Sequence, residues 1–578
     1  MRLEEYWGVG PKTREQLEST IGRERAIRAI ESADVRALTE AGLSRGRATR
    51  ILRRATGGAG LETLATGDTR SVYKDLLDLA AAHAVTAGAE DRIRVLTPLT
   101  DRAAMEERLD AVLAARDAWR GLAEDERERV LAAFETYDEE GESERAAVEA
   151  ALALRAVGVT EGPFAALADL DPEGLDAAAD ALGAVDGEEV REGVDEDLDR
   201  LRETTAAVER LGASALDVID DVRDAGARDA AEFRAAFVER VREETDIDPA
   251  RVREATPEDA ADPTDFVGEG LRELESALRA ELVEREREVR ERLEGAVEAA
   301  REDVDRAVET VDDAALYLSL ARFADAHDMT RPTFGDGGVA VRDARNLGLD
   351  AAGETVQPVS YALGETDLDI GAGDERVAVV TGANSGGKTT LLETVCGVVL
   401  LAAMGLPVPA AAAEVTTFDE VVFHRRHASF NAGVLESTLR SIVPPLTGGG
   451  KTLMLVDEFE AITEPGSAAD LLHGLVQLTV DRDAVGAFVT HLADDLEPLP
   501  DEARVDGIFA EGLDPDLALQ VDYQPRFHTV GKSTPEFIVS RLVADAADRT
   551  ERTGFETLAE AVGDEVVQRT LADARFRE

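Results

Sequence analysis

Hydrophobic residues recur along the chain with several spacings, and each spacing predicts a different structure. From about residue 185 to 325, apolar positions recur every three or four residues between dense opposite charges, as in 273–293. That spacing is typical of long helices with one apolar stripe and a solvated face. Residues 56–184 are rich in alanine and leucine at helical spacing, with few strand formers, which predicts a helical core.

The pattern changes after about residue 330. Short β-branched runs at 377–381, 453–457 and 487–490 alternate with helical stretches, which predicts a parallel sheet covered by helices. We therefore expect a multidomain protein with five segments: a small helical module at 1–55, a helical core at 56–184, long charged helices returning to the core at 185–329, an α/β domain at 330–545 and a helical tail at 546–578.

One uncharged stretch has nearly the length of a membrane span. Residues 395–413 contain 19 positions without a charge. Gly405, Pro407 and Pro409 interrupt any helix there, so we expect a buried helix followed by a strand, and no membrane partner. The first residues lack an apolar run, which predicts no signal peptide, and the single cysteine, Cys396, favours a reducing cytoplasm.

The net charge of −58 comes from 121 acidic and 63 basic residues, spread along the whole chain. An acidic protein ordinarily makes a poor partner for nucleic acid. An excess distributed in this way instead indicates a surface adapted to high salt, where the Debye length is about 3 Å at 1 M. Local basic patches then matter more than the total charge.

Residues 382–389 match the phosphate-loop pattern G-x-x-x-x-G-K-[ST], with an apolar strand before them and a helix-forming run after them. Glycines let backbone N–H groups converge on phosphate oxygens, and the helix N-terminus adds positive potential. Lys388 can reach the outer phosphates of ATP, and Thr389 can ligate Mg²⁺. The predicted nucleotide-binding residues are Gly382, Ala383, Asn384, Ser385, Gly386, Gly387, Lys388, Thr389 and Thr390.

Carboxylates follow a second apolar strand about 70 residues later, at Asp457 and Glu458. A carboxylate at a strand end can hold Mg²⁺ through water, and a following glutamate can polarise an attacking water. A third strand ends at His491, where a γ-phosphate sensor would lie. Lys388, Glu458 and His491 are thus the predicted catalytic residues, and Thr389 and Asp457 the predicted metal ligands.

The stretches TGANSGGKTTLLETV, LMLVDEFEAITEPGSAADLL and FVTHL together resemble the ATPase domain of the MutS family, a branch of the ABC ATPases. Shorter likenesses at 97–102, 318–321, 406–410 and 531–542 extend the resemblance to residues 85–545, densely over 376–542. It implies a homodimer in which each ATP is sandwiched between two subunits. It also implies that 463–468 crosses the dimer interface, and that the trans-acting serine motif lies near 429–437, at Ser429 or Asn431.

Two glycine turns, at 6–13 and 41–48, resemble the hairpins of a helix-hairpin-helix module, which binds DNA phosphates without reading bases. Residues 1–55 hold twelve basic and eight acidic residues, a local charge of +4. The alternative is a small helical docking domain. The predicted DNA-binding residues are Gly8, Gly10, Lys12, Thr13, Arg45, Arg47 and Arg50.

Mismatch-repair members of the family read mispairs with an N-terminal F-x-E motif, and this chain has no phenylalanine before Phe134. From the length of sequence after Arg541 we also expect no extra nuclease-type domain. It is therefore most similar to the archaeal second MutS branch, which implies a DNA-binding ATPase without mismatch specificity.

Alternatives are a mismatch- or recombination-intermediate-binding protein, a chromosome-organising ABC clamp and a transporter ATPase subunit. A clamp separates the loop from the carboxylates by hundreds of residues, and a transporter subunit carries L-S-G-G-Q, which is absent here. Nuclease activity stays open.

Overall fold

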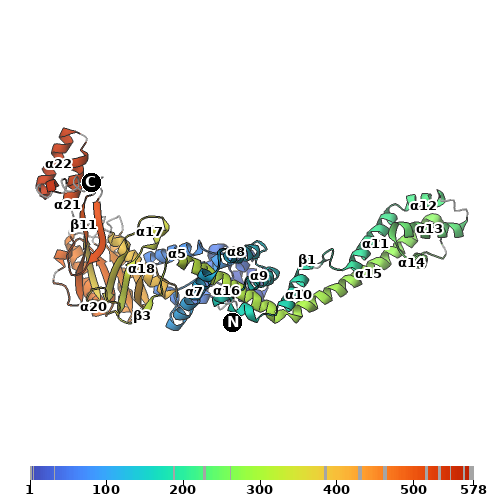
Figure 1. The fold of residues 1–578 in the computed structure, drawn as a ribbon, viewed down its shortest axis with the longest axis horizontal. Coiled ribbons are helices and arrows are strands. Elements are labelled where there is room, and N and C mark those ends of the chain that lie inside the picture. The colour runs from blue at the N-terminus through green and yellow to red at the C-terminus, as the bar shows by residue number, and fades with distance from the viewer. Residues whose placement is uncertain are drawn as a thin grey trace. The chain divides into compact units, whose positions relative to one another are not determined.

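The computed structural model comprises two compact units, each described separately (Figure 1). The first unit contains Met1–Asp138, Val159–Ala165 and Asp312–Glu578, and the second Glu139–Gly158 and Ala166–Val311. The structure describes all residues except 1–2, 4–5, 32, 160, 187–188, 225–228, 259, 261, 383–386, 427–431, 460–464, 497, 514–518, 532–534, 547, 564–566, 570 and 572–578.

Four short helices form the N-terminal module of the first unit: α1 (Pro11–Thr20), α2 (Arg23–Glu31), α3 (Val35–Glu40) and α4 (Arg45–Gly57). Helices α1 and α4 each begin three residues after a turn glycine, Gly8 with φ 81° and Gly42 with φ 87°. Glycine adopts this left-handed region at little cost. The four helices share one hydrophobic cluster, which Val95 completes from the core.

Helices of the core follow: η2 (Gly60–Thr63), α5 (Gly67–Ala81), α6 (Ala87–Arg94), α7 (Arg102–Gly121), α8 (Glu124–Glu139) and, much later, α16 (Arg301–Ala326). The apolar face of α5 and the C-terminal half of α16 belong to the same buried cluster as the α/β domain. The hydrogen bond from Thr66 Oγ1 to the Phe423 carbonyl joins the start of α5 to strand β8. Core and α/β domain therefore share one packed interior.

The main sheet has six strands in the order β12-β11-β6-β10-β9-β8. Its strands are β6 (Val377–Gly382), β8 (Glu420–His424), β9 (Thr452–Asp457), β10 (Val485–Val489), β11 (Ala503–Leu513) and β12 (Leu519–Arg526). All neighbouring pairs are parallel except β11 and β12. Parallel strands align their carboxyl ends, so whatever follows β6, β9 and β10 lies at one edge.

Helices cover both faces of this sheet, which explains why its strands are continuous apolar runs. Ala378 and Val380 of β6 join α18 (Lys388–Ala403) in one cluster. Val377 and Val379 point the other way, to the cluster containing α19 (Ala432–Thr447) and α20 (Pro465–Asp481). This is the helix-covered parallel sheet predicted for 330–545.

A second sheet of the same unit has the strand order β3-β7-β4-β5. Its elements are β3 (Thr333–Gly335), β4 (Gly338–Ala344), α17 (Leu347–Ala351), β5 (Val359–Gly364) and β7 (Ala412–Thr416). The uncharged stretch 395–413 thus divides between α18 and β7, turning at Gly405 with φ 68°. At the C-terminus, α21 (Pro535–Asp545) packs on α22 (Arg549–Val562) around a small cluster.

The second unit is built on α15 (Pro263–Ala299), a 37-residue helix that α11 (Glu196–Ala213) packs against. A cluster at one end of α15 contains apolar side chains from four shorter helices. The remaining elements are α9 (Glu144–Val157), η3 (Gly162–Asp169), α10 (Pro172–Gly183), β1 (Val185–Asp186), β2 (Glu189–Val190), α12 (Ala215–Asp224), α13 (Ala230–Thr245) and α14 (Pro249–Glu254), with the first part of η3 in the first unit.

Among the described residues, no single helix is long and apolar enough to cross a membrane. The bent pair α9 and η3 meets that test only in combination, by length and composition.

Candidate nucleotide site and N-terminal module

The predicted phosphate loop connects the end of β6 to the start of α18, and its residues 383–386 lie outside the described part of the chain. Glycine is required at both described ends. Gly382 has φ 133°, and a Cβ there would lie 2.1 Å from the Ile508 carbonyl oxygen. Gly387 caps α18 with φ 70°, and its Cβ would lie 2.8 Å from the Tyr523 ring.

Lys388 and Thr389 open helix α18 and point back to the sheet edge. The Lys388 side chain is buried, and its Nζ donates a 3.0 Å hydrogen bond to the Gly382 carbonyl. Thr389 Oγ1 donates to Asp457 Oδ2 at 2.7 Å, across 68 residues of sequence. The structure therefore brings together the predicted phosphate-binding and metal-binding side chains.

Asp457 ends β9 with its side chain almost fully enclosed, at 2% exposure. Burial raises the pKa of its carboxyl group, an effect that the hydrogen bond from Thr389 partly offsets. Its second oxygen, Oδ1, is buried and has no hydrogen-bond partner among the described residues. An unpartnered carboxylate oxygen beside a threonine hydroxyl suits a hard cation such as Mg²⁺.

Glu458 follows with φ 43°, a left-handed conformation that a non-glycine residue rarely adopts. Its backbone N–H is held by the Val489 carbonyl at 3.0 Å. One carboxylate oxygen, Oε1, lies 3.2 Å from His491 Nε2, and Oε2 lies 2.6 Å from the Arg426 guanidinium. The predicted water-activating residue and the predicted phosphate sensor thus meet, and Arg426 joins them.

Sequence reasoning missed Arg426 because it missed strand β8. The run 420–424 is short, and its place beside β9 as a parallel neighbour depends on pairing between distant segments. Once β8 is recognised, the two arginines that follow it must lie beside the carboxylates that follow β9.

A cavity of about 380 Å³ adjoins the described ends of the loop and is lined by Lys388, Thr389 and Glu458. This volume lies in the range of small-molecule sites. The opposite wall comes from the segment between α17 and β5 and from Tyr523 on β12, where the Tyr523 N–H donates to Gln357 Oε1 at 3.2 Å. No motif marks this wall, so it could not be predicted from the sequence.

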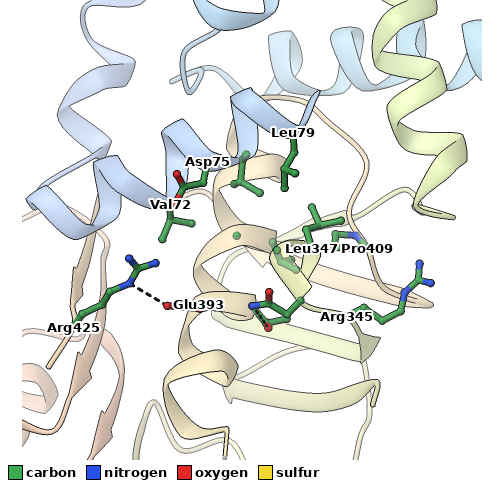
Figure 2. A pocket seen from close by; sticks show the side chains of 14 residues that line it. Val72, Asp75, Leu79, Arg345, Leu347, Glu393, Pro409 and Arg425 are labelled. Carbon is green, nitrogen blue, oxygen red and sulfur yellow. Dashed lines mark hydrogen bonds and ion pairs between the residues drawn. The ribbon is translucent and has the colours of Figure 1, made fainter. Parts of the chain in front are cut away.

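A smaller pocket of about 90 Å³ lies between α18 and α5. Figure 2 shows Val72 and Asp75 of α5 on one side and Glu393 of α18 on the other, with Arg425 directed at Glu393. The Arg425–Glu393 ion pair measures 3.0 Å. Burial raises the pKa of Glu393, and Arg425 partly offsets the rise. Arg425 therefore contacts α18, and the next residue, Arg426, contacts the Glu458 carboxylate.

The N-terminal module separates the residues predicted to bind DNA. Lys12 and Arg50 are exposed, and Gly8 and Gly10 form the first turn. Thr13 is buried and accepts a 2.6 Å hydrogen bond from Arg47. Arg45 forms an ion pair with Asp91 and lies 3.5 Å from Glu90, both on α6.

Other predicted positions fall outside the described residues. These are Ser429, Asn431 and positions 463–464 of the proposed interface segment, whose remainder begins α20.

A strand, a glycine-rich loop and a helix, with carboxylates at the end of another parallel strand of the same sheet, form the arrangement of P-loop proteins. Residues 378–443, from β6 into α19, match MutS domain V. The chain is 40% identical over 273 residues to the DNA-binding protein MutS2 of Pyrococcus furiosus, covering 47% of each protein. Over these residues the chain is similar to MutS domain V and to MutS2 proteins.

Two further relatives show the same similarity at lower coverage. The DNA mismatch repair protein MutS 2 of Halobacterium salinarum is 34% identical over 37% of this chain and 24% of the relative. The Endonuclease MutS2 of Solidesulfovibrio magneticus is 32% identical over 36% of this chain and 28% of the relative. The chain spans about half the length, or less, of the curated relatives it matches.

Proposed function

We propose that the protein is a DNA-binding ATPase that hydrolyses ATP to ADP and phosphate and binds DNA without mismatch specificity. The observation that carries the proposal is the convergence of Lys388, Thr389 and the β9 carboxylates at one sheet edge, beside a cavity of suitable size. No single one of these groups would suffice, because phosphate binding and water activation need different chemistry.

Each residue has a distinct role in this proposal. Lys388 binds the outer phosphates. Thr389 and Asp457 hold Mg²⁺, which when bound would neutralise phosphate charge. Glu458, whose backbone is left-handed, accepts a proton from the attacking water. His491, within hydrogen-bond reach of Glu458, senses the γ-phosphate.

The working form is a homodimer in which a second copy closes over each nucleotide. The family resemblance supports this part, since it assigns 463–468 to the interface and a residue near Ser429 or Asn431 to the partner's nucleotide. A site completed by a partner would keep hydrolysis slow until both copies are in place.

DNA binding is assigned to the N-terminal module. Its net charge of +4 within a chain of −58, and its two glycine turns before α1 and α4, favour contacts with phosphates. Such contacts hold DNA without reading its sequence. The printed name of the Pyrococcus furiosus relative, a DNA-binding protein, agrees with this assignment.

Two measurements test the proposal together. Phosphate release from ATP, followed in molar salt, should require Mg²⁺ and stop when the metal is chelated. Matched, mismatched, tailed and branched DNAs, titrated in the same buffer, should all bind, with mismatched and matched duplexes equal in affinity. Metal-independent release would exclude the proposed ATPase site, and a tenfold preference for mismatches would exclude the proposed DNA specificity.

A further inference from the structure

The arginines of α4 lie on two faces of the helix. Arg45 and Arg53 face the core, where Arg45 pairs with Asp91 and Arg53 donates two hydrogen bonds to the Arg94 carbonyl. Arg47, Arg50 and Arg54 lie three and four residues apart, which places them on one exposed face. The first set attaches the module to the core. In the second set Arg47 also donates to Thr13, and Arg50 and Arg54 are exposed.

Two acidic residues of the module pair with arginines outside this second face. Glu18 pairs with Arg14, and Glu40 lies within ion-pair distance of Arg25 and Arg36. Arg50 forms no ion pair with the part of the chain that the structure describes. Within the described part of the chain, no carboxylate therefore neutralises Arg50.

Trp7 lies at the edge of this face. Its side chain is 52% exposed, immediately before the turn glycine Gly8, while its neighbours Tyr6 and Val9 are buried in the module. The Arg54 guanidinium lies over the Trp7 ring, 5.5 Å from its centroid. The other tryptophan of the chain, Trp119, is buried in α7 at 9% exposure. A single exposed apolar side chain is common on protein surfaces, and the Arg54 guanidinium over the ring is what distinguishes this one.

We propose that Trp7, with Arg54 over its ring and Arg50 on the same exposed face of α4 as Arg54, is a stacking platform for unpaired nucleobases, so that the module prefers DNA with single-stranded tails or gaps. The proposal rests on the DNA binding proposed above and deepens it by naming the DNA class. Aromatic platforms beside cationic side chains bind single strands because every base presents a π face. Paired bases in a continuous duplex keep their faces stacked and present none, whether the pair is matched or not.

In high salt, stacking on Trp7 should supply a larger share of the DNA-binding affinity. Phosphate contacts weaken steeply as salt rises, because binding releases condensed counterions. Stacking does not depend on counterion release, so it retains its strength in the concentrated salt to which the acidic surface is suited. The indole would then supply the part of the affinity that salt does not remove.

The experiment uses the full-length Trp119→Phe protein, in which Trp7 is the only tryptophan. Its fluorescence is titrated with a blunt duplex and with the same duplex carrying a single-stranded tail. We expect the tailed DNA to quench Trp7 emission and to bind more tightly. We expect the blunt duplex to bind with little quenching, because phosphate contacts leave the indole unstacked.

Two variants separate stacking from charge. Trp7→Ala should lower the affinity for tailed DNA about tenfold and leave the affinity for blunt duplex unchanged. The loss for tailed DNA should persist at about 1 M salt. Trp7→Phe should restore most of the loss. Arg54→Gln should lower the affinity for both DNAs at low salt. Arg25→Gln removes an equal charge, but one that is paired with Glu40, so it should lower the affinity less.

The outcomes distinguish the two proposals. Equal affinity of Trp7→Ala and the parent for tailed DNA, or equal quenching by both DNAs, overturns the stacking platform while leaving DNA binding intact. If the parent protein binds neither DNA, the proposed DNA-binding function itself fails.

Discussion

The proposed nucleotide site and the exposed face of α4 both carry positive charge that we propose binds phosphate, but the two regions hold that charge differently. Lys388 is 4% exposed and its ammonium group is hydrogen-bonded to the protein. Arg50 and Arg54 are exposed on a helix surface. A buried cation has one geometry and a high local field, whereas an exposed one has many geometries and is screened by salt. Substitutions in the first region should therefore change rates sharply, and those in the second should change affinity gradually.

The largest expected effect is that of Lys388→Ala. Removing the buried ammonium leaves the outer phosphates without their charge partner, so we expect ATP hydrolysis to fall to background. Phosphate release is the measurement. Lys451→Ala is the matched control, because Lys451 is 51% exposed and its ammonium group pairs with Asp336 instead. Similar turnover in both variants would remove the distinction between the two regions.

Glu458→Ala should slow hydrolysis by about 10²- to 10⁴-fold while retaining ATP affinity, because it removes the proton acceptor and leaves the phosphate-binding residues in place. The uncleaved nucleotide should also hold two subunits together. Nucleotide binding and light scattering with ATP and Mg²⁺ check both points. A protein that stays monomeric with ATP would contradict the sandwiched dimer, and one that no longer binds ATP would contradict the role given to Glu458.

Deleting residues 1–55 should weaken binding to matched and mismatched duplexes equally and leave basal hydrolysis largely intact. The plot of log K against log salt should flatten by about 0.9 for each phosphate that the shortened protein no longer neutralises. Because Val95 packs in the hydrophobic cluster of the module, the deletion also exposes apolar surface on the core. In the double variant Arg50→Gln/Arg54→Gln the module still covers this apolar surface, and the variant should reproduce the change in slope. Unchanged duplex affinity in both proteins would make the module a docking domain.

The smallest expected effect is that of Arg45→Gln on DNA affinity. Arg45 is among the DNA contacts that the sequence predicts, and its guanidinium group lies against Asp91 and Glu90. Those carboxylates already neutralise it, so we expect a change within about twofold, in keeping with the small energies of paired surface charges. Arg50→Gln, on the exposed face, should cost more. A larger loss for Arg45→Gln would reverse the assignment of the two faces of α4.

The central strands and the carboxylates after β9 could be predicted because each is a local signal. An apolar run followed by Gly382 or Asp457 fits a buried strand that ends at a site. Arg426 could not be found in this way, since its role depends on β8 pairing beside β9. The same holds for Gln357 and Tyr523, which meet from segments 166 positions apart.

The two faces of α4 also depend on contacts with a distant segment, which the local sequence does not predict. Helical spacing predicts that Arg47, Arg50 and Arg54 lie together. Which face turns inward depends on Asp91 and the Arg94 carbonyl of α6, and nothing within α4 specifies them. Likewise the exposure of Trp7 follows from the turn at Gly8 and not from its own residue type.

The hydrogen bond between Thr66 and Phe423 also has a consequence during protein synthesis. Its partners are 357 positions apart, and α5 completes the same interior as strand β8. At about 5–20 residues per second, a ribosome needs roughly 20–70 s to extend the chain from one to the other. Throughout that interval the apolar face of α5 has no partner from the sheet. The nascent chain thus exposes the apolar face of α5 for many seconds, and holdase chaperones should bind this face.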